Sequence, residues 1–154
     1  MELRKQRLTA KALVLASLCA GTVMVNTGVA VAADDTFAVV TAFDGCTTTP
    51  NAAWKGFAQF QDYGPGAPGG GDNDDYVIVG DSCADGRGVK AWAWVDGDYK
   101  GAKYVGTGVD TSAVWDPLGN VPGGHSVGLK VCSVDGNNDS TALWCDSHTV
   151  TIDG

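Results

Sequence analysis

The chain has 154 residues, enough for one ordinary domain, with a formal net charge of −8, 44% hydrophobic residues and 22 glycines. So acidic a chain lacks the basic surface that nucleic acids and anionic membranes require. Its hydrophobic content is too high for a disordered protein.

The N-terminal segment, residues 1–33, has the pattern of a secretory signal peptide. Four basic residues lie among the first eleven, an apolar stretch follows, and Ala30-Val-Ala32-Ala33 provides small residues for cleavage after Ala32 or Ala33. Asn26-Thr27-Gly28 interrupts the apolar stretch, which leaves fewer than the roughly 20 residues of a membrane anchor. We therefore expect a secreted, extracellular protein with one domain over 34–154.

From residue 34 onward, the composition favours strands over helices. All 17 acidic residues there are aspartate, and 20 residues are glycine. Glutamate is a good helix former, whereas aspartate and glycine favour turns. Apolar residues mostly alternate with polar ones, which is typical of strands with one buried face.

The first half of this domain predicts three strands. β-Branched and aromatic residues over 36–43 and the apolar run 76–79 favour two of them. Segment 52–61 also allows helical spacing, but Gly56 weakens a helix, so we predict a strand at 55–61. Between the strands predicted at 55–61 and 76–79, the Pro- and Gly-rich residues 65–71 and the acidic residues 72–75 predict a flexible loop.

The second half predicts five strands in two hairpins and a single strand. Residues 89–95 and 99–105 flank Asp96-Gly97-Asp98, a hairpin turn signal. A weaker strand covers 111–115, and strands 127–134 and 143–152 flank the turn residues 135–140. These eight short strands predict an all-β fold: a monomeric, immunoglobulin-like antiparallel β-sandwich of about seven to eight strands.

Four cysteines remain after removal of the signal peptide, and they predict two disulfides in a small exported domain. A hairpin centred between residues 138 and 139 places Cys132 opposite Cys145, within the disulfide range. Cys46 and Cys83 are then left to pair with each other. In this register, two polar residues fall on the apolar face of the hairpin, Asp146 and His148.

Four segments carry a resemblance to known proteins: Gly56-Phe57-Ala-Gln-Phe60, Val77-x-Val79-x-Asp81, Ala84-Asp-Gly-Arg-Gly-Val89-x-Ala91 and Val127-Gly-Leu-Lys-Val-Cys132-x-Val-Asp-Gly136. Together they resemble a loose group of small, uncharacterised secreted actinomycete proteins. The resemblance covers residues 56–136. It implies export and an all-β fold, and it implies no catalytic residues.

Gly124-His-Ser126-Val-Gly128 matches the G-x-S-x-G nucleophile elbow of α/β-hydrolases, and His148 follows in the right order. An elbow needs a buried strand before the serine and a helix after it. Here a turn region precedes Ser126 and a predicted strand follows it. We therefore expect no catalytic residues, with a minimal esterase using Ser126 as the alternative.

The second predicted hairpin contains a calcium-like spacing. Asp135, Asn137, Asp139 and Asp146 place oxygen ligands at loop positions one, three, five and twelve. However, Ser140 stands where an EF-hand needs glycine, and Asp146 stands where it uses glutamate. We therefore expect no metal or other cofactor, with a weak calcium site at these four residues as the alternative.

Trp92 and Trp94 share one face of the predicted strand 89–95, roughly 6.6 Å apart along it. If this face is exposed, the two indoles can stack on sugar rings. If it faces the other sheet, they belong to the core. Sandwich cores often contain a buried tryptophan, which favours the core for at least one of them.

These patterns predict a secreted, non-catalytic binding or interaction module. Its partner is an unknown protein or glycan, not nucleic acid and, once the signal is cleaved, not a membrane. An alternative is a small secreted enzyme inhibitor or ligand carrier, by analogy with actinomycete amylase inhibitors and enediyne apoproteins. Those proteins share its small size, acidity and two disulfides, but their cysteine spacings and the inhibitors' Trp-Arg-Tyr motif are absent here.

Overall fold

The structure is a computed structural model that describes residues 34–41, 46, 54–62, 75–106, 108 and 110–153. The predicted signal peptide and residues 65–74 of the predicted acidic loop lie outside the described residues. Among the residues described, no helix has the length and apolar character needed to cross a membrane.

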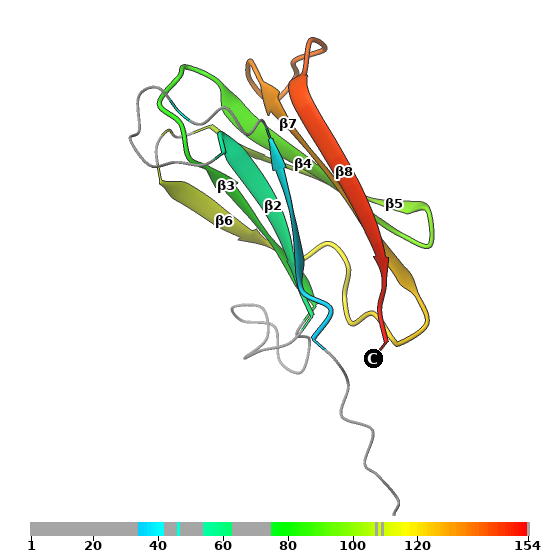
Figure 1. The fold of residues 1–154 in the computed structure, drawn as a ribbon. Coiled ribbons are helices and arrows are strands. Elements are labelled where there is room, and N and C mark those ends of the chain that lie inside the picture. The colour runs from blue at the N-terminus through cyan, green and yellow to red at the C-terminus, as the bar shows by residue number, and fades with distance from the viewer. Residues whose placement is uncertain are drawn as a thin grey trace, which may run out of the picture. The chain divides into compact units, whose positions relative to one another are not determined.

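The described residues form eight strands in two four-stranded antiparallel sheets (Figure 1). One sheet has the order β1-β2-β3-β6, built from β1 (Phe37–Thr41), β2 (Gly56–Gln61), β3 (Tyr76–Asp81) and β6 (Thr111–Trp115). The other has the order β5-β4-β7-β8, built from β4 (Gly88–Val95), β5 (Asp98–Val105), β7 (Ser126–Val134) and β8 (Leu143–Thr151). This confirms the predicted all-β sandwich, including a strand in the ambiguous segment 55–61.

The sandwich is immunoglobulin-like in its two packed antiparallel sheets, with one difference in strand order. β2 and β3 are hydrogen-bonded neighbours, with Ala58 opposite Val79. In the constant-type immunoglobulin order, the second and third strands lie in different sheets. Here the chain changes sheet only after β3, so β4 begins the second sheet.

The core lies between the sheets and takes alternate residues from their inner faces. Its buried members include Ala58, Phe60, Val77, Val79, Val89, Ala91, Ala93, Val127, Leu129 and Val131. The sheets approach closely at β2, where a Cβ added to Gly56 would lie 2.1 Å from Val89 Cγ2. Small residues on the inner face of β4 fit this narrow gap.

A two-residue turn joins β4 to β5. Val95 pairs with Asp98, and the intervening Asp96 and Gly97 have φ angles of 52° and 84°. Two successive positive φ angles define the type I′ turn that matches the twist of a β-hairpin. The predicted hairpin across Asp96-Gly97-Asp98 is therefore confirmed.

The β7–β8 hairpin has the predicted register near its open end. Val127 lies opposite Val150, and Leu129 lies opposite His148. The register shifts between Val131 and Ser133, and Trp144 in the facing strand has a φ of 49°. β8 is an edge strand, so the two polar residues on the inner side, Asp146 and His148, remain exposed to solvent.

Both predicted disulfides are present. Cys46 is bonded to Cys83, and Cys132 is bonded to Cys145. The first pair ties the segment after β1 to the end of β3, and the second crosses the β7–β8 hairpin. Two disulfides in so small a domain are typical of an oxidising environment.

Candidate functional site

Trp92 and Trp94 lie on the outer face of the β5-β4-β7-β8 sheet. Their strand neighbours Ala91 and Ala93 are fully buried in the core, whereas both indoles point the other way and are partly exposed. The expectation that at least one belongs to the core is therefore wrong. The narrow gap between the sheets accommodates valine and alanine at this point, and it is Trp115 of β6 that packs against the core.

This outer face contains a hollow of about 330 Å³ over β4, β7 and β8. Its lining includes Trp94, Ser126, Gly128, Lys130, Ser147 and Thr149. Gly128 lies opposite Trp94 on one side and opposite Thr149 on the other. A Cβ added to Gly128 would lie 3.1 Å from Thr149 Oγ1 and 3.8 Å from Trp94 Cβ. Because Gly128 has no side chain, its backbone forms the floor of the hollow.

Tyr99 extends the aromatic surface beside the hollow. A bulge between Ala93 and Trp94 shifts the β4–β5 register, so Trp94 faces Tyr99 across the hairpin. The two ring centroids are 5.9 Å apart at an interplanar angle of 50°, and Tyr99 is 58% exposed. The pair presents flat apolar surface to solvent next to the polar groups of the hollow.

Trp92 has different neighbours. The Nζ atoms of Lys90 and Lys130 both lie 5.5 Å from the centroid of its ring. Lys130 sits directly opposite Trp92 in the β4–β7 pairing. Both distances fall within the range of a cation–π contact. Of the two predicted stacking residues, Trp94 lines the hollow and Trp92 supports two ammonium groups.

A polar cluster at the rim of the hollow ties the β4–β5 turn to the start of β7. Asp96 accepts hydrogen bonds from Ser126 N at 2.8 Å and Ser126 Oγ at 3.2 Å, and its other oxygen lies 2.5 Å from His125 Nδ1. The bond from the Ser126 amide, followed by that from His125, lowers the pKa of Asp96. This carboxylate holds the turn against β7.

The geometry around Ser126 differs from that of a hydrolase elbow. Ser126 begins β7, so a strand and not a helix follows it. Its hydroxyl donates to Asp96, a carboxylate of lowered pKa and hence a weak base. His148 lies on the inner side of the sheet, 5.5 Å from the Phe37 ring, whereas Ser126 lines the outer hollow. Ser126 and His148 therefore do not form the serine–histidine pair that the hydrolase motif needs.

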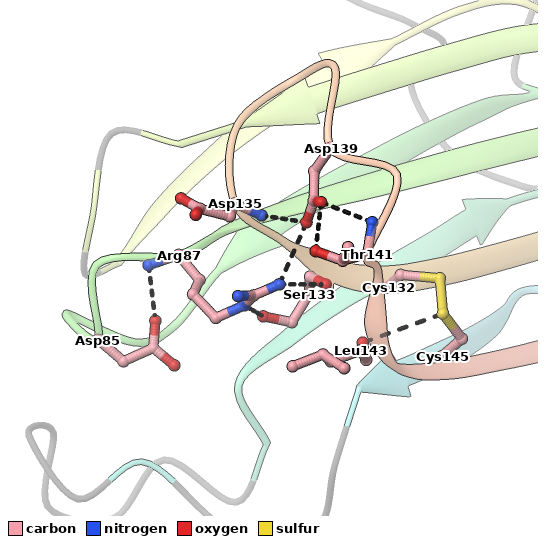
Figure 2. Close-up of polar contacts among 9 residues, drawn as sticks. All are labelled: Asp85, Arg87, Cys132, Ser133, Asp135, Asp139, Thr141, Leu143 and Cys145. Carbon is pink, nitrogen blue, oxygen red and sulfur yellow. Dashed lines mark hydrogen bonds and ion pairs between the residues drawn. A yellow bond between two sulfur atoms is a disulfide. The ribbon is translucent and has the colours of Figure 1, made fainter.

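The predicted calcium loop is organised by hydrogen bonds to Asp139 (Figure 2). Its carboxylate accepts from Asp135 N, Thr141 N and Thr141 Oγ1, each at 2.6 Å, and from Arg87 at 3.3 Å. These donors, led by the Asp135 amide, lower the pKa of Asp139 to about 2. Asp139 thus closes the hairpin loop with protein donors.

The other predicted calcium ligands do not join Asp139 in a site. The backbone carbonyl of Asn137 accepts a hydrogen bond from Lys90 Nζ at 2.6 Å, and Asp146 lies opposite Val131 within the β7–β8 ladder. Among the described residues, no three His, Cys, Asp or Glu side chains are placed to hold a metal ion.

Sequence reasoning missed most of the outer-face site. Lys130, Ser147 and Thr149 carry no motif, and they lie beside Trp94 only because β7 lies between β4 and β8. Tyr99 also carries no motif, and it reaches Trp94 across the β4–β5 hairpin. The alternation of residues along β4, which places Trp92 and Trp94 on one face, was the one signal of this site in the sequence. Comparison of the chain with protein-family models, curated proteins and solved structures finds no match.

Proposed function

We propose that this protein is a secreted, non-catalytic carbohydrate-binding domain that binds its ligand on the outer face of the β5-β4-β7-β8 sheet. One observation carries the proposal: an exposed hollow places an indole beside hydroxyl and ammonium groups. Sugars have this dual character, with C–H groups on the faces of the ring and hydroxyls around its edge.

The chemistry of the hollow suits such a ligand. Trp94 and Tyr99 offer apolar surface for the ring face. Ser147 and Thr149 are exposed on β8, so their hydroxyls are available to donate to and accept from sugar hydroxyls. A volume of about 330 Å³ lies at the small end of the range for ligand sites, which favours one or two sugar units.

The site is also rigid. It lies on paired strands, its floor is backbone, and the Asp96 cluster fixes the adjoining turn. Little conformational freedom is then lost when a ligand binds, which favours affinity for a small contact area. Rigid support also suits a domain that binds its ligand without converting it.

Titration of the purified protein against a panel of oligosaccharides, followed by tryptophan fluorescence and calorimetry, tests the proposal. We expect at least one member to bind, and Trp94→Ala to weaken its binding by at least about tenfold, as loss of a central aromatic contact does. Gly128→Val should also block binding, because the valine side chain would fill the hollow.

Trp54→Ala is the matched control, because Trp54 is 39% exposed and precedes β2 in the other sheet. It should bind like the parent protein. The proposal fails if no saccharide binds, or if Trp94→Ala and Gly128→Val bind as well as Trp54→Ala.

A further inference from the structure

Four basic residues of the described domain contrast in their partners. Lys55 and Arg87 are each within an ion pair, to Asp85 at 3.4 Å and to Asp139 at 3.3 Å. Lys90 and Lys130 instead converge on Trp92, and within the described ranges neither is ion-paired to a carboxylate. Lys100 and Lys103 likewise make no ion pair within the described residues, but neither lies over Trp92.

Lys90 and Lys130 make the outer face locally positive. Lys90 donates to the Asn137 carbonyl, and both ammonium groups lie 5.5 Å from the same indole centroid. The two ammonium groups repel each other, and the electron-rich face of Trp92 offsets part of that repulsion. A bound anion would remove the remainder. The arrangement therefore favours an anionic ligand over a neutral one.

The position of Lys130 links this charge to the hollow. Lys130 lines the hollow together with Trp94, so a ligand ring against Trp94 lies beside the Lys130 ammonium. An ammonium group offers three donors and pairs well with a carboxylate. We propose that the ligand is an acidic sugar, whose carboxylate is bound by Lys130 with Lys90 reinforcing the charge. This inference rests on the proposed carbohydrate-binding function.

The acidic character of the whole chain does not oppose such a contact. Charges on exposed groups are largely screened beyond about 8 Å at physiological ionic strength. A carboxylate in the hollow therefore responds mainly to the lysines next to it, and distant aspartates repel it weakly. The same screening predicts that binding weakens as salt is added.

Oligogalacturonate and its methyl ester provide a direct test, because esterification removes the charge and keeps the sugar backbone. We expect the purified protein to bind the acid at least about tenfold more tightly than the ester, the scale of a charge-assisted hydrogen bond. Lys130→Gln should abolish this preference, and Lys90→Gln should reduce it. Both lysines are partly exposed, so both variants should fold. Lys130→Gln should keep the parent melting temperature, and Lys90→Gln should lower it slightly because the bond to the Asn137 carbonyl is lost.

Lys103→Gln is the matched control. Lys103 pairs with core-facing Ala91, so it lies on the opposite side of the sheet from Lys130 while carrying the same charge. Its removal should leave the preference intact. A loss of preference equal to that of Lys130→Gln would show a general charge effect and overturn the assignment.

The possible failures are distinguishable. Equal binding of acid and ester, or binding of neither while a neutral saccharide binds in a Trp94-dependent way, overturns the acidic-sugar inference alone. A preference that survives Lys90→Gln combined with Lys130→Gln overturns the role of the lysines. Binding of no saccharide at all overturns both this inference and the proposed function.

Discussion

Asp139 is a single residue that organises the whole β7–β8 loop. It joins both ends of the loop through the Asp135 and Thr141 amides, and it reaches Arg87 before β4 (Figure 2). Backbone amides in a loop have no ladder partner, so a carboxylate that accepts from two of them replaces missing secondary structure. This role accounts for the residue without a metal.

Asp139→Asn should lower the melting temperature at neutral pH. The pKa of Asp139 in the native state is about 2, below its ordinary value of 3.8. Its ionised form therefore stabilises the fold fully above about pH 4, and this contribution is lost as the pH falls toward 2. Thermal unfolding between pH 2 and 7 should show a gap between parent and variant that closes in acid. Asp135→Asn is the control, because Asp135 contributes its backbone amide to this cluster, and it should show a smaller gap in melting temperature. A gap between parent and Asp139→Asn that stays constant with pH would contradict the assignment.

Asp81 has the opposite environment. It is 2% exposed at the end of β3, and its Oδ1 accepts from Cys83 N. Its Oδ2 makes no hydrogen bond of normal geometry within the described residues, and the backbone of Gly108 lowers the pKa of the carboxyl only as a minor cause. Burial is the largest cause that raises the pKa of this carboxyl. Across β2, Thr41 is equally buried, and its Oγ1 also lacks a partner in the described part of the chain.

Asp81→Asn should therefore stabilise the protein at neutral pH, by a few degrees in melting temperature. A raised native pKa means that the protonated form suits the fold, so stability from this group is present below about pH 4 and lost as the pH rises through the native pKa. The gain in the variant should shrink as the pH approaches 4. Asp98→Asn, an exposed aspartate that begins β5, serves as the control. Destabilisation by Asp81→Asn at pH 7 would refute this account.

At the scale of elements, the two disulfides close loops of different length. Cys46 and Cys83 are 37 positions apart in the sequence, and Cys132 and Cys145 are 13 positions apart. Cross-links restrict the unfolded chain more when they close longer loops. The short cross-link adds to a hairpin already held by strand pairing, whereas the long one joins the segment after β1 to the end of β3.

Removal of the Cys46–Cys83 pair by double substitution to alanine should cost more stability than removal of the Cys132–Cys145 pair. The loop lengths correspond to roughly 4 and roughly 3 kcal/mol in the chain-entropy model. Paired substitution avoids a free thiol in either variant. Urea unfolding of both variants measures the difference. A larger loss for the Cys132–Cys145 pair would mean that contacts in the native hairpin outweigh the loop entropy.

At the scale of the whole molecule, the outer faces of the two sheets differ in one respect that decides where a ligand fits. Each face has a central glycine. At Gly80 the space is filled, since an added Cβ would lie 2.3 Å from the Phe57 ring. At Gly128 the nearest side-chain atom would lie 3.1 Å away, and a hollow remains. The β5-β4-β7-β8 sheet therefore carries the candidate site.

Much of the architecture could be predicted from local sequence. Alternation located the strands, the Asp96-Gly97 turn identified one hairpin, and hairpin register placed Cys132 opposite Cys145. These features depend on residues close in sequence, whose geometry follows from backbone preferences and the period of two along a strand. The bulge at Trp144 was not foreseen, because nothing in its neighbours signals an extra residue.

The site depended on contacts between distant strands. The alternation of β4 placed Trp92 and Trp94 on one face, but the sequence could not decide whether that face was inside or outside. That choice rests on how closely the two sheets pack at Gly56 and Val89, and on β7 pairing with β4 to bring Gly128 and Lys130 beside the indoles. A strand carries its pattern in its own residues, whereas its sheet neighbours are selected by the packing of the whole core, and only the tertiary structure shows that selection.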